Sequence, residues 1–134
     1  MPTNLKAFVA DLFTSRRVLR ERHSAFQKRV FFAIAEGTTI RTPVLSGKGR
    51  GGWRGSRGSV DDTDQPEDMV GNTVLSKARS FIESLPKDSL DTLFWSNPVE
   101  YMIFLEEGSS SQAPAGIVDI TVAETAVRFN RVQE

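Results

Sequence analysis

The densest group of side chains that could do chemistry is a basic segment in the first half of the chain. Its members are Arg41, Lys48, Arg50, Trp53, Arg54 and Arg57, with no acidic residue between them. Arginine pairs with phosphate or carboxylate through two parallel hydrogen bonds, and tryptophan stacks on a nucleobase or anchors a protein interface. The segment therefore predicts contact with nucleic acid or with a protein partner. The plain alternative is a solvated loop without a ligand.

An acidic segment follows directly. Five carboxylates fall within eight residues, and they are Asp61, Asp62, Asp64, Glu67 and Asp68. In a ring of subunits, the basic segment of one copy could meet the acidic segment of the next, a head-to-tail contact that closes when the rotation per subunit divides a circle. The same acids also favour the positive N-terminal end of a following helix. The two roles do not exclude each other.

Glycines in the basic segment match a nucleotide-binding pattern without its context. Gly47, Gly49 and Gly52 satisfy G-x-G-x-x-G, but that fingerprint needs a helix after it whose N-terminus holds a pyrophosphate. Trp53 follows here instead. A phosphate-binding P-loop fails too, because Gly49 follows Lys48 where Ser or Thr must bind magnesium. We therefore expect no nucleotide cofactor.

The sequence contains no constellation for catalysis or metal binding. Glu106 and Glu107 are adjacent, so their carboxylates diverge on a helix or a strand. His23 is the only histidine and cysteine is absent, which leaves a metal ion without a ligand set and rules out disulfides. The serines at 109–111 form a polar loop with no base tied to them. We expect no enzyme, no cofactor and no metal site.

Size and composition indicate one domain over residues 1–134, since single cores typically hold about 100 to 200 residues. Seventeen basic and seventeen acidic residues cancel, so any electrostatic partner must meet a local patch. Asp11 interrupts the first apolar stretch, unlike a signal peptide, and no run of about eighteen apolar residues could span a bilayer. We expect no membrane partner.

Apolar residues recur every three or four positions from Asn4 to about Glu36, which predicts one long helix ended by Gly37. At 1.5 Å per residue, about 30 residues would span roughly 45 Å, so part of the helix could project or pack along a neighbouring subunit. Residues 38–42 favour a short strand, closed by Pro43. Six glycines between 47 and 58 raise the cost of ordering the backbone, so we expect a flexible loop over about residues 45–65.

The second half of the chain predicts further helix and strand. A capping-box spacing from Asp64 to Glu67 and helical periodicity predict a helix over 66–84, and residues 90–96 predict a strand. Residues 100–107 fit a strand or a single helical turn. Residues 115–130 fit either period, and Pro114 near the start with no later breaker favours a helix. The fold class is α+β, with a long N-terminal helix, a small antiparallel sheet, a second helix, a C-terminal helix and a flexible Gly-rich basic loop.

Two stretches together resemble a known family. They are TPVLSGKGRGGW at 42–53 and NPVEYMIFLEEGSSSQAPAGIVDITVAE at 97–124. The tail-completion proteins of long-tailed bacteriophages, also called head-tail connector or neck proteins, carry a similar order of residues and a final helix. The matching residues are Thr42, Pro43, Val44, Gly47, Arg50, Gly51, Trp53, Asn97, Tyr101, Leu105, Glu106, Gly108, Gln112, Ala113, Pro114 and Gly116. The long 47–68 segment with its acids departs from the tighter turn of many relatives.

The resemblance implies a structural virion protein that forms a homo-oligomeric, hexameric ring at the head-tail junction. Such a ring joins the tail to the DNA-filled capsid, contacts the adjacent connector and tail proteins, and lets DNA pass without sequence-specific contact. It would be assembled in the cytoplasm of the bacterial host and end in the virion. The resemblance also implies a structural or interface role for Glu106. The runner-up is a nucleic-acid-binding module that uses the Arg/Trp arm around residues 48–57.

Residues from three parts of the chain are the candidates for the interface. They are Arg41, Lys48, Arg50, Trp53, Arg54, Arg57, Asp61, Asp62, Asp64, Glu106 and Gln112. The first ten follow from charge, aromatic character or the family pattern, and Gln112 belongs to the polar loop that we expect at a rim of the ring.

Overall fold

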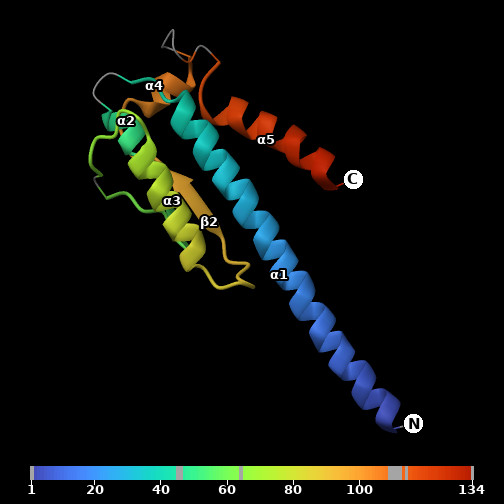
Figure 1. The fold of residues 1–134 in the computed structure, drawn as a ribbon. Helices are drawn as coiled ribbons and strands as arrows, with labels where there is room; N and C mark the ends of the chain where they lie inside the picture. The colour runs from blue at the N-terminus through green and yellow to red at the C-terminus, as the bar shows by residue number, and fades with distance from the viewer. Residues whose placement is uncertain (1, 45–46, 64, 109–112, 114, 134) are drawn as a thin grey trace.

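A single long helix, α1, organises the molecule, and the other elements pack around its C-terminal half (Figure 1). The computed structural model describes residues 2–44, 47–63, 65–108, 113 and 115–133. In chain order the elements are α1 (Pro2–Arg41), α2 (Lys48–Gly51), β1 (Arg54–Arg57), α3 (Asn72–Ser84), β2 (Leu93–Ser96), α4 (Met102–Glu106) and α5 (Val118–Gln133). Helix α3 and the two strands lie on one side of α1, and α5 lies on the other (Figure 1). The expected α+β class, with long N-terminal and C-terminal helices and a small antiparallel sheet, is confirmed.

Helix α1 does not end at Gly37, and the strand expected over 38–42 is wrong. The helix continues to Arg41, and the hydroxyls of Thr38 and Thr42 donate to the carbonyls of Ile34 and Thr38 at 2.8 and 2.7 Å. Gly37 lies where α5 crosses, and a Cβ there would stand 2.7 Å from Thr121 Cγ2. The glycine therefore permits close helix packing, and tertiary contacts override the β propensity of the threonines.

The segment expected to be a flexible loop over 45–65 contains regular structure instead. It holds α2 and then β1, which pairs antiparallel with β2 in a register that joins Arg54 to Ser96 and Arg57 to Leu93. Gly51 is buried, and a Cβ there would lie 2.2 Å from the carbonyl oxygen of Pro66. Glycine is required here because two backbone segments approach closely. The glycines of this segment therefore serve close packing, where the sequence alone predicts a flexible loop.

Helix α3 begins later than the predicted residue 66. Gly71 precedes it with φ of 93°, a conformation that interrupts any helix running in from Pro66. Gly71 is the N-cap residue, and the carboxylate of Asp68 before it accepts from the N–H groups of Gly71 at 2.8 Å and Val74 at 3.0 Å. The predicted capping box is therefore wrong, and Asp64 itself lies outside the described residues.

The remaining expectations for the second half agree with the structure. The strand expected over 90–96 is β2, although its ladder covers only Leu93–Ser96. The stretch 100–107, which fitted either period, forms the short helix α4, and the C-terminal helix is α5. Pro114 and the serines at 109–111 fall outside the described residues.

Two stacked tryptophans join the sheet to the end of α1. The ring centroids of Trp53 and Trp95 are 5.8 Å apart, and the two ring planes are within 2° of parallel. Each indole N–H donates to a threonine hydroxyl at 2.7 Å, Trp95 to Thr38 in α1 and Trp53 to Thr42, which directly follows α1. The surrounding core contains Val74, Met102, Ala113 and Ile117. Burial of these apolar side chains and satisfaction of both indole N–H groups fix the body on the C-terminal half of α1.

Candidate assembly surfaces

Most of the basic segment faces inward. Trp53 is 6% exposed and Arg54 is 7% exposed, so neither offers its side chain to an outside ligand. Arg54 donates from Nε to the carbonyl of Gly52 at 2.7 Å and from Nη1 to the carbonyls of Asp61 and Thr63. Its guanidinium also lies 3.6 Å from the Asp61 carboxylate. Arg54 therefore holds the 61–63 loop on β1, where a buried cation has its hydrogen bonds satisfied.

Arg50 closes the C-terminal end of α1. It donates from Nη2 to the carbonyls of Ile40 at 3.1 Å and Thr42 at 2.8 Å, and from Nη1 to the carbonyl of Met69 at 2.9 Å. The last carbonyls of a helix have no partner within the helix, and a cation placed there also complements the helix dipole. Arg50 is therefore a structural cap that links α1 to the segment before α3.

The other predicted cations lie nearer the surface. Arg41 donates to Thr121 Oγ1 at 2.8 Å and pairs with Glu124, which ties α1 to α5. Arg57 pairs with Asp91 beside the end of the sheet. The exposed Lys48 lines a cleft together with Arg54, Asp62 and Tyr101. Of this group, only Lys48 and Arg57 expose much of their side chains.

The predicted meeting of basic and acidic segments takes place within one chain for Arg54 and Asp61. The Asp61 carboxylate accepts from the backbone N–H of Thr63 at 3.0 Å and from its hydroxyl at 2.7 Å, and these bonds lower the pKa of Asp61 below its usual value. Asp62 is exposed beside them. Asp64 and Gln112, the remaining candidates of this kind, lie outside the described residues.

Glu106 caps α5 from the neighbouring helix α4. Its carboxylate accepts the N–H groups of Ile117, Val118 and Asp119 at 2.8, 2.7 and 2.9 Å. Partial burial raises the pKa of Glu106, but the three N–H donors outweigh it and hold the pKa below its usual value. The close approach requires Gly116, since a Cβ there would lie 2.5 Å from the Glu106 carbonyl oxygen. Glu106 therefore fixes the corner between α4 and α5.

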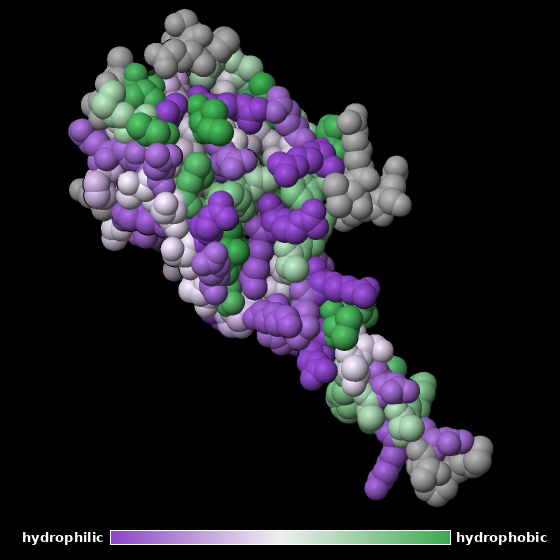
Figure 2. Space-filling model, in the orientation of Figure 1, coloured by the Kyte–Doolittle hydropathy of each residue, from purple (hydrophilic) through white to green (hydrophobic). Residues whose placement is uncertain are grey.

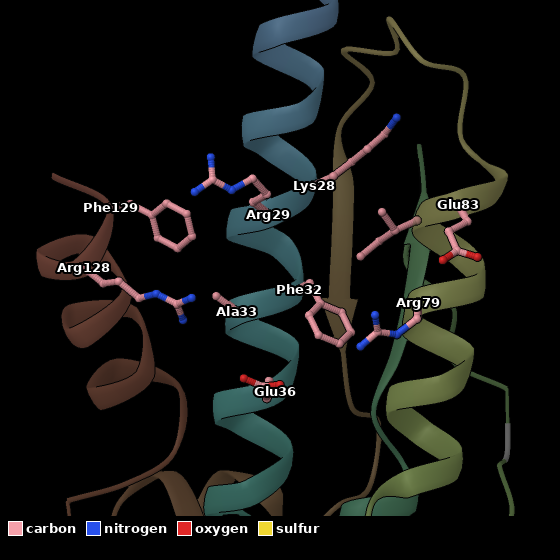
Figure 3. A pocket seen from close by; sticks show the side chains of 10 residues that line it. Lys28, Arg29, Phe32, Ala33, Glu36, Arg79, Glu83, Arg128 and Phe129 are labelled. Atoms are coloured by element: carbon pink, nitrogen blue, oxygen red, sulfur yellow. The ribbon is translucent and has the colours of Figure 1, made fainter. Parts of the chain in front are cut away.

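A shallow cleft of about 330 Å³ crosses α1 between α3 and α5 (Figure 3). The guanidinium of Arg79 lies 4.7 Å from the centroid of the Phe32 ring, and those of Arg29 and Arg128 lie 5.5 and 5.3 Å from that of Phe129. The arginines shield these rings from water through cation–π contacts. Sequence reasoning missed the cleft because its residues come from three helices far apart in the chain.

The N-terminal part of α1 extends beyond the body, and we name residues 4–20 the arm (Figure 1). Every side chain of the arm is exposed. Its large apolar side chains are Leu5, Phe8, Val9, Leu12, Phe13, Val18 and Leu19, of which Leu5, Phe13 and Leu19 are each 64% exposed. Figure 2 shows apolar residues along this projecting part of the helix. Five of them, Leu5, Phe8, Val9, Leu12 and Leu19, belong to the periodicity that predicted the helix, but the sequence does not show whether the body covers them.

A second exposed apolar surface lies at the other end of the molecule. We name Ile103 and Phe104 on α4 together with Val118 and Val122 on α5 the α4–α5 patch, since the hydrogen bonds of Glu106 join α4 to the start of α5. Ile103 is 68% exposed and Phe104 is 61% exposed. Exposed apolar surface of this kind is typical of a protein contact.

Neither a cluster of metal ligands nor a membrane-spanning helix is found in the described part of the chain. No group of three or more His, Cys, Asp or Glu residues there could hold a metal ion. No helix among the described residues is both long enough and apolar enough to cross a membrane. Comparison of the chain with models of known protein families, with curated proteins and with solved structures gave no match.

Proposed function

We propose that this chain is a structural virion protein of a long-tailed bacteriophage. In this proposal it forms a homo-oligomeric ring, hexameric as in the family that it resembles, at the junction of head and tail. The ring joins the tail to the DNA-filled capsid, contacts the adjacent connector and tail proteins, and lets DNA pass through its lumen. The chain acts in the virion by geometry, without catalysis and without a cofactor.

The arm is the observation that carries this proposal. It holds seven large apolar side chains that the body of the same chain leaves exposed. Exposed apolar area of this extent is costly in water and is retained where another protein covers it. Such a helix is expected in a subunit whose exposed apolar side chains are buried only when it assembles with other chains.

Several of the residues shared with the family also support a structural role, because their side chains bind other parts of the same chain. Trp53 donates to Thr42, and the side-chain amide of Asn97 donates to the carbonyl of Gly49 at 2.6 Å. Arg50 caps α1 and Glu106 caps α5. The shared residues therefore stabilise turns and helix ends, as expected where a family has a common scaffold and no common active site.

The nucleic-acid alternative loses its two central residues. Trp53 is stacked on Trp95 inside the core and could not stack on a base without unfolding. The Arg54 guanidinium is buried among carbonyls of its own chain. Lys48 and Arg57 alone make too small a basic surface for a neutral protein to bind nucleic acid strongly.

Electron microscopy of particles made with the gene inactivated tests the proposal. Filled heads and unattached tails, or tails that are missing or irregular, should accumulate, and the wild-type chain supplied in trans should restore infectious particles. A chain that lacks residues 2–20 should fail to restore them, while Lys77→Ala, a change at an exposed site on α3, should restore them fully. Normal yields of infectious particles without the gene would refute the proposal.

A further inference from the structure

Charge is strongly separated along this formally neutral chain. The arm carries Lys6, Arg16, Arg17 and Arg20 against Asp11, which gives four positive and one negative charge, or a net +3. The stretch 88–127 carries seven acidic residues and no Lys or Arg, or a net −7. That stretch includes β2, α4 and the first half of α5, which lie away from the arm (Figure 1).

Three leucines and two arginines of the arm share one face of the helix. Leu5, Leu12 and Leu19 recur every seven residues and therefore form a row along the helix. Arg16 is four residues after Leu12 and three before Leu19, so it lies in the same row, and Arg20 follows Arg16 by one turn. A surface that matches this face must be apolar and must carry acids at its rim.

The α4–α5 patch has these properties. Its four apolar side chains, Ile103, Phe104, Val118 and Val122, are all at least 38% exposed. The exposed acids Glu100 and Glu107 flank α4 in the sequence, and Asp119 lies in the first turn of α5. Glu106 fixes the angle between α4 and α5 through its three hydrogen bonds, so the patch is preorganised before any contact forms.

The arm cannot reach the patch of its own chain. Helix α1 runs without a break from Pro2 to Arg41, and the seventeen residues of the arm extend about 25 Å away from the body at 1.5 Å per residue. Pairing of two arms is disfavoured as well, since each carries a net positive charge and Ser15 interrupts the apolar seam between Leu12 and Leu19.

We propose that the arm of one copy docks on the α4–α5 patch of the next copy. Leu5, Leu12 and Leu19 cover the patch, and Arg16 and Arg20 face Glu100 and Glu107 at its rim. The contact joins two different surfaces, so it repeats from copy to copy and closes into a ring when the rotation per copy divides a circle. The inference deepens the proposed function and rests on it.

Cross-linking tests the pairing directly, because the chain has no cysteine of its own. Leu12→Cys and Val122→Cys chains are purified separately, mixed, and treated with a short bismaleimide linker. Covalent dimers should form in the mixture and be rare with either variant alone. A mixture of Leu12→Cys with Ser80→Cys, an exposed site on α3, is the matched control and should give few dimers. Dimers formed equally well by Leu12→Cys alone, or no dimers in the first mixture, would overturn the proposal.

Reversing the charges on both sides of the contact distinguishes binding to the α4–α5 patch from binding of the basic, apolar arm to some other surface. Arg16→Glu with Arg20→Glu should weaken self-association, measured by sedimentation velocity, at least tenfold, and Glu100→Lys with Glu107→Lys in a second chain should restore the mixed association. Lys6→Glu with Arg17→Glu makes the same change in net charge off the Leu5–Leu12–Leu19 row and should weaken association less. Absence of rescue, with binding of the wild-type arm to anionic vesicles or to duplex DNA, would overturn the proposal.

The outcomes also distinguish this inference from the proposed function. If the doubly reversed arm still restores infectious particles and the cross-link is absent, the arm contact is wrong and the neck assignment stands. If the cross-link and the rescue are found but phage assembly does not need the gene, the contact is right and the neck assignment fails. A wild-type chain that stays monomeric up to about 1 mM would overturn the contact itself.

Discussion

Replacing Thr42 by Val tests whether the threonine–tryptophan contacts fix the body on α1. Thr42 is fully buried, its hydroxyl accepts from Trp53 Nε1 at 2.7 Å, and valine has nearly the same shape. The change therefore opens no cavity but leaves the buried indole N–H without an acceptor, which costs about 1–3 kcal/mol of the free energy of unfolding. At about 2.1 cal/mol/K per residue, 134 residues have an unfolding entropy of about 0.28 kcal/mol/K, so a loss of about 2 kcal/mol lowers Tm by about 7 °C.

Thr39→Val is the matched control, three residues earlier in the last turn of α1. Thr39 is 1% exposed, and its hydroxyl has no hydrogen-bond partner among the described residues. The same substitution should leave stability unchanged or raise it slightly, because it removes a buried polar group that is unsatisfied. Denaturant unfolding and thermal unfolding followed by circular dichroism measure both variants. Equal effects of Thr42→Val and Thr39→Val would refute the argument that the indole bond stabilises the fold.

Three further predictions concern single contacts. The pKa of Glu106 is lowered in the folded state, so its charged carboxylate stabilises the fold at pH values above the unfolded pKa, and this stabilisation is lost as the pH falls through the folded pKa. Glu106→Gln should therefore make Tm fall less steeply below about pH 5. An unchanged slope of Tm against pH would count against the cap. Gly51→Ala should lower the free energy of unfolding, measured in urea, by about 1–3 kcal/mol or more, because the new Cβ would lie 2.2 Å from the Pro66 carbonyl oxygen. An unchanged free energy of unfolding would contradict that close approach. Arg57→Ala should cost less than about 1 kcal/mol in the same assay, since its ion pair with Asp91 is nearly half exposed, and a larger loss would show that the pair is stronger than an ordinary surface pair.

Local periodicity predicted the elements whose cause is local. The apolar repeat at residues 4–36 and the strand-favouring residues at 90–96 predicted the positions of α1 and β2. The C-terminal helix was also predicted, although its pattern fitted a strand as well. In these segments the sequence neighbours of a residue decide its conformation.

The errors have long-range causes. Gly37 suggests the end of a helix until Thr121, which is distant in the sequence, is known to cross there. Arg50 and Arg54 suggest ligand binding in the sequence, but in the structure they donate to backbone carbonyls of their own chain. No local pattern distinguishes an arginine that caps a helix from one that binds a phosphate, because both use the same N–H donors. The candidate site was therefore the least predictable part of the chain.

Helix α1 runs without a break from the arm into the body. The number of residues between them therefore fixes the direction in which the Leu5–Leu12–Leu19 row faces relative to the body. Each residue inserted or deleted between about residues 21 and 25 would turn the Leu5–Leu12–Leu19 row by about 100° around the helix axis. A change of seven residues, nearly two whole turns, would restore the row to within about 20° while altering the reach of the arm by about 10 Å. Length variants of this helix that still assemble should therefore differ by close to a whole number of turns, such as seven or eleven residues.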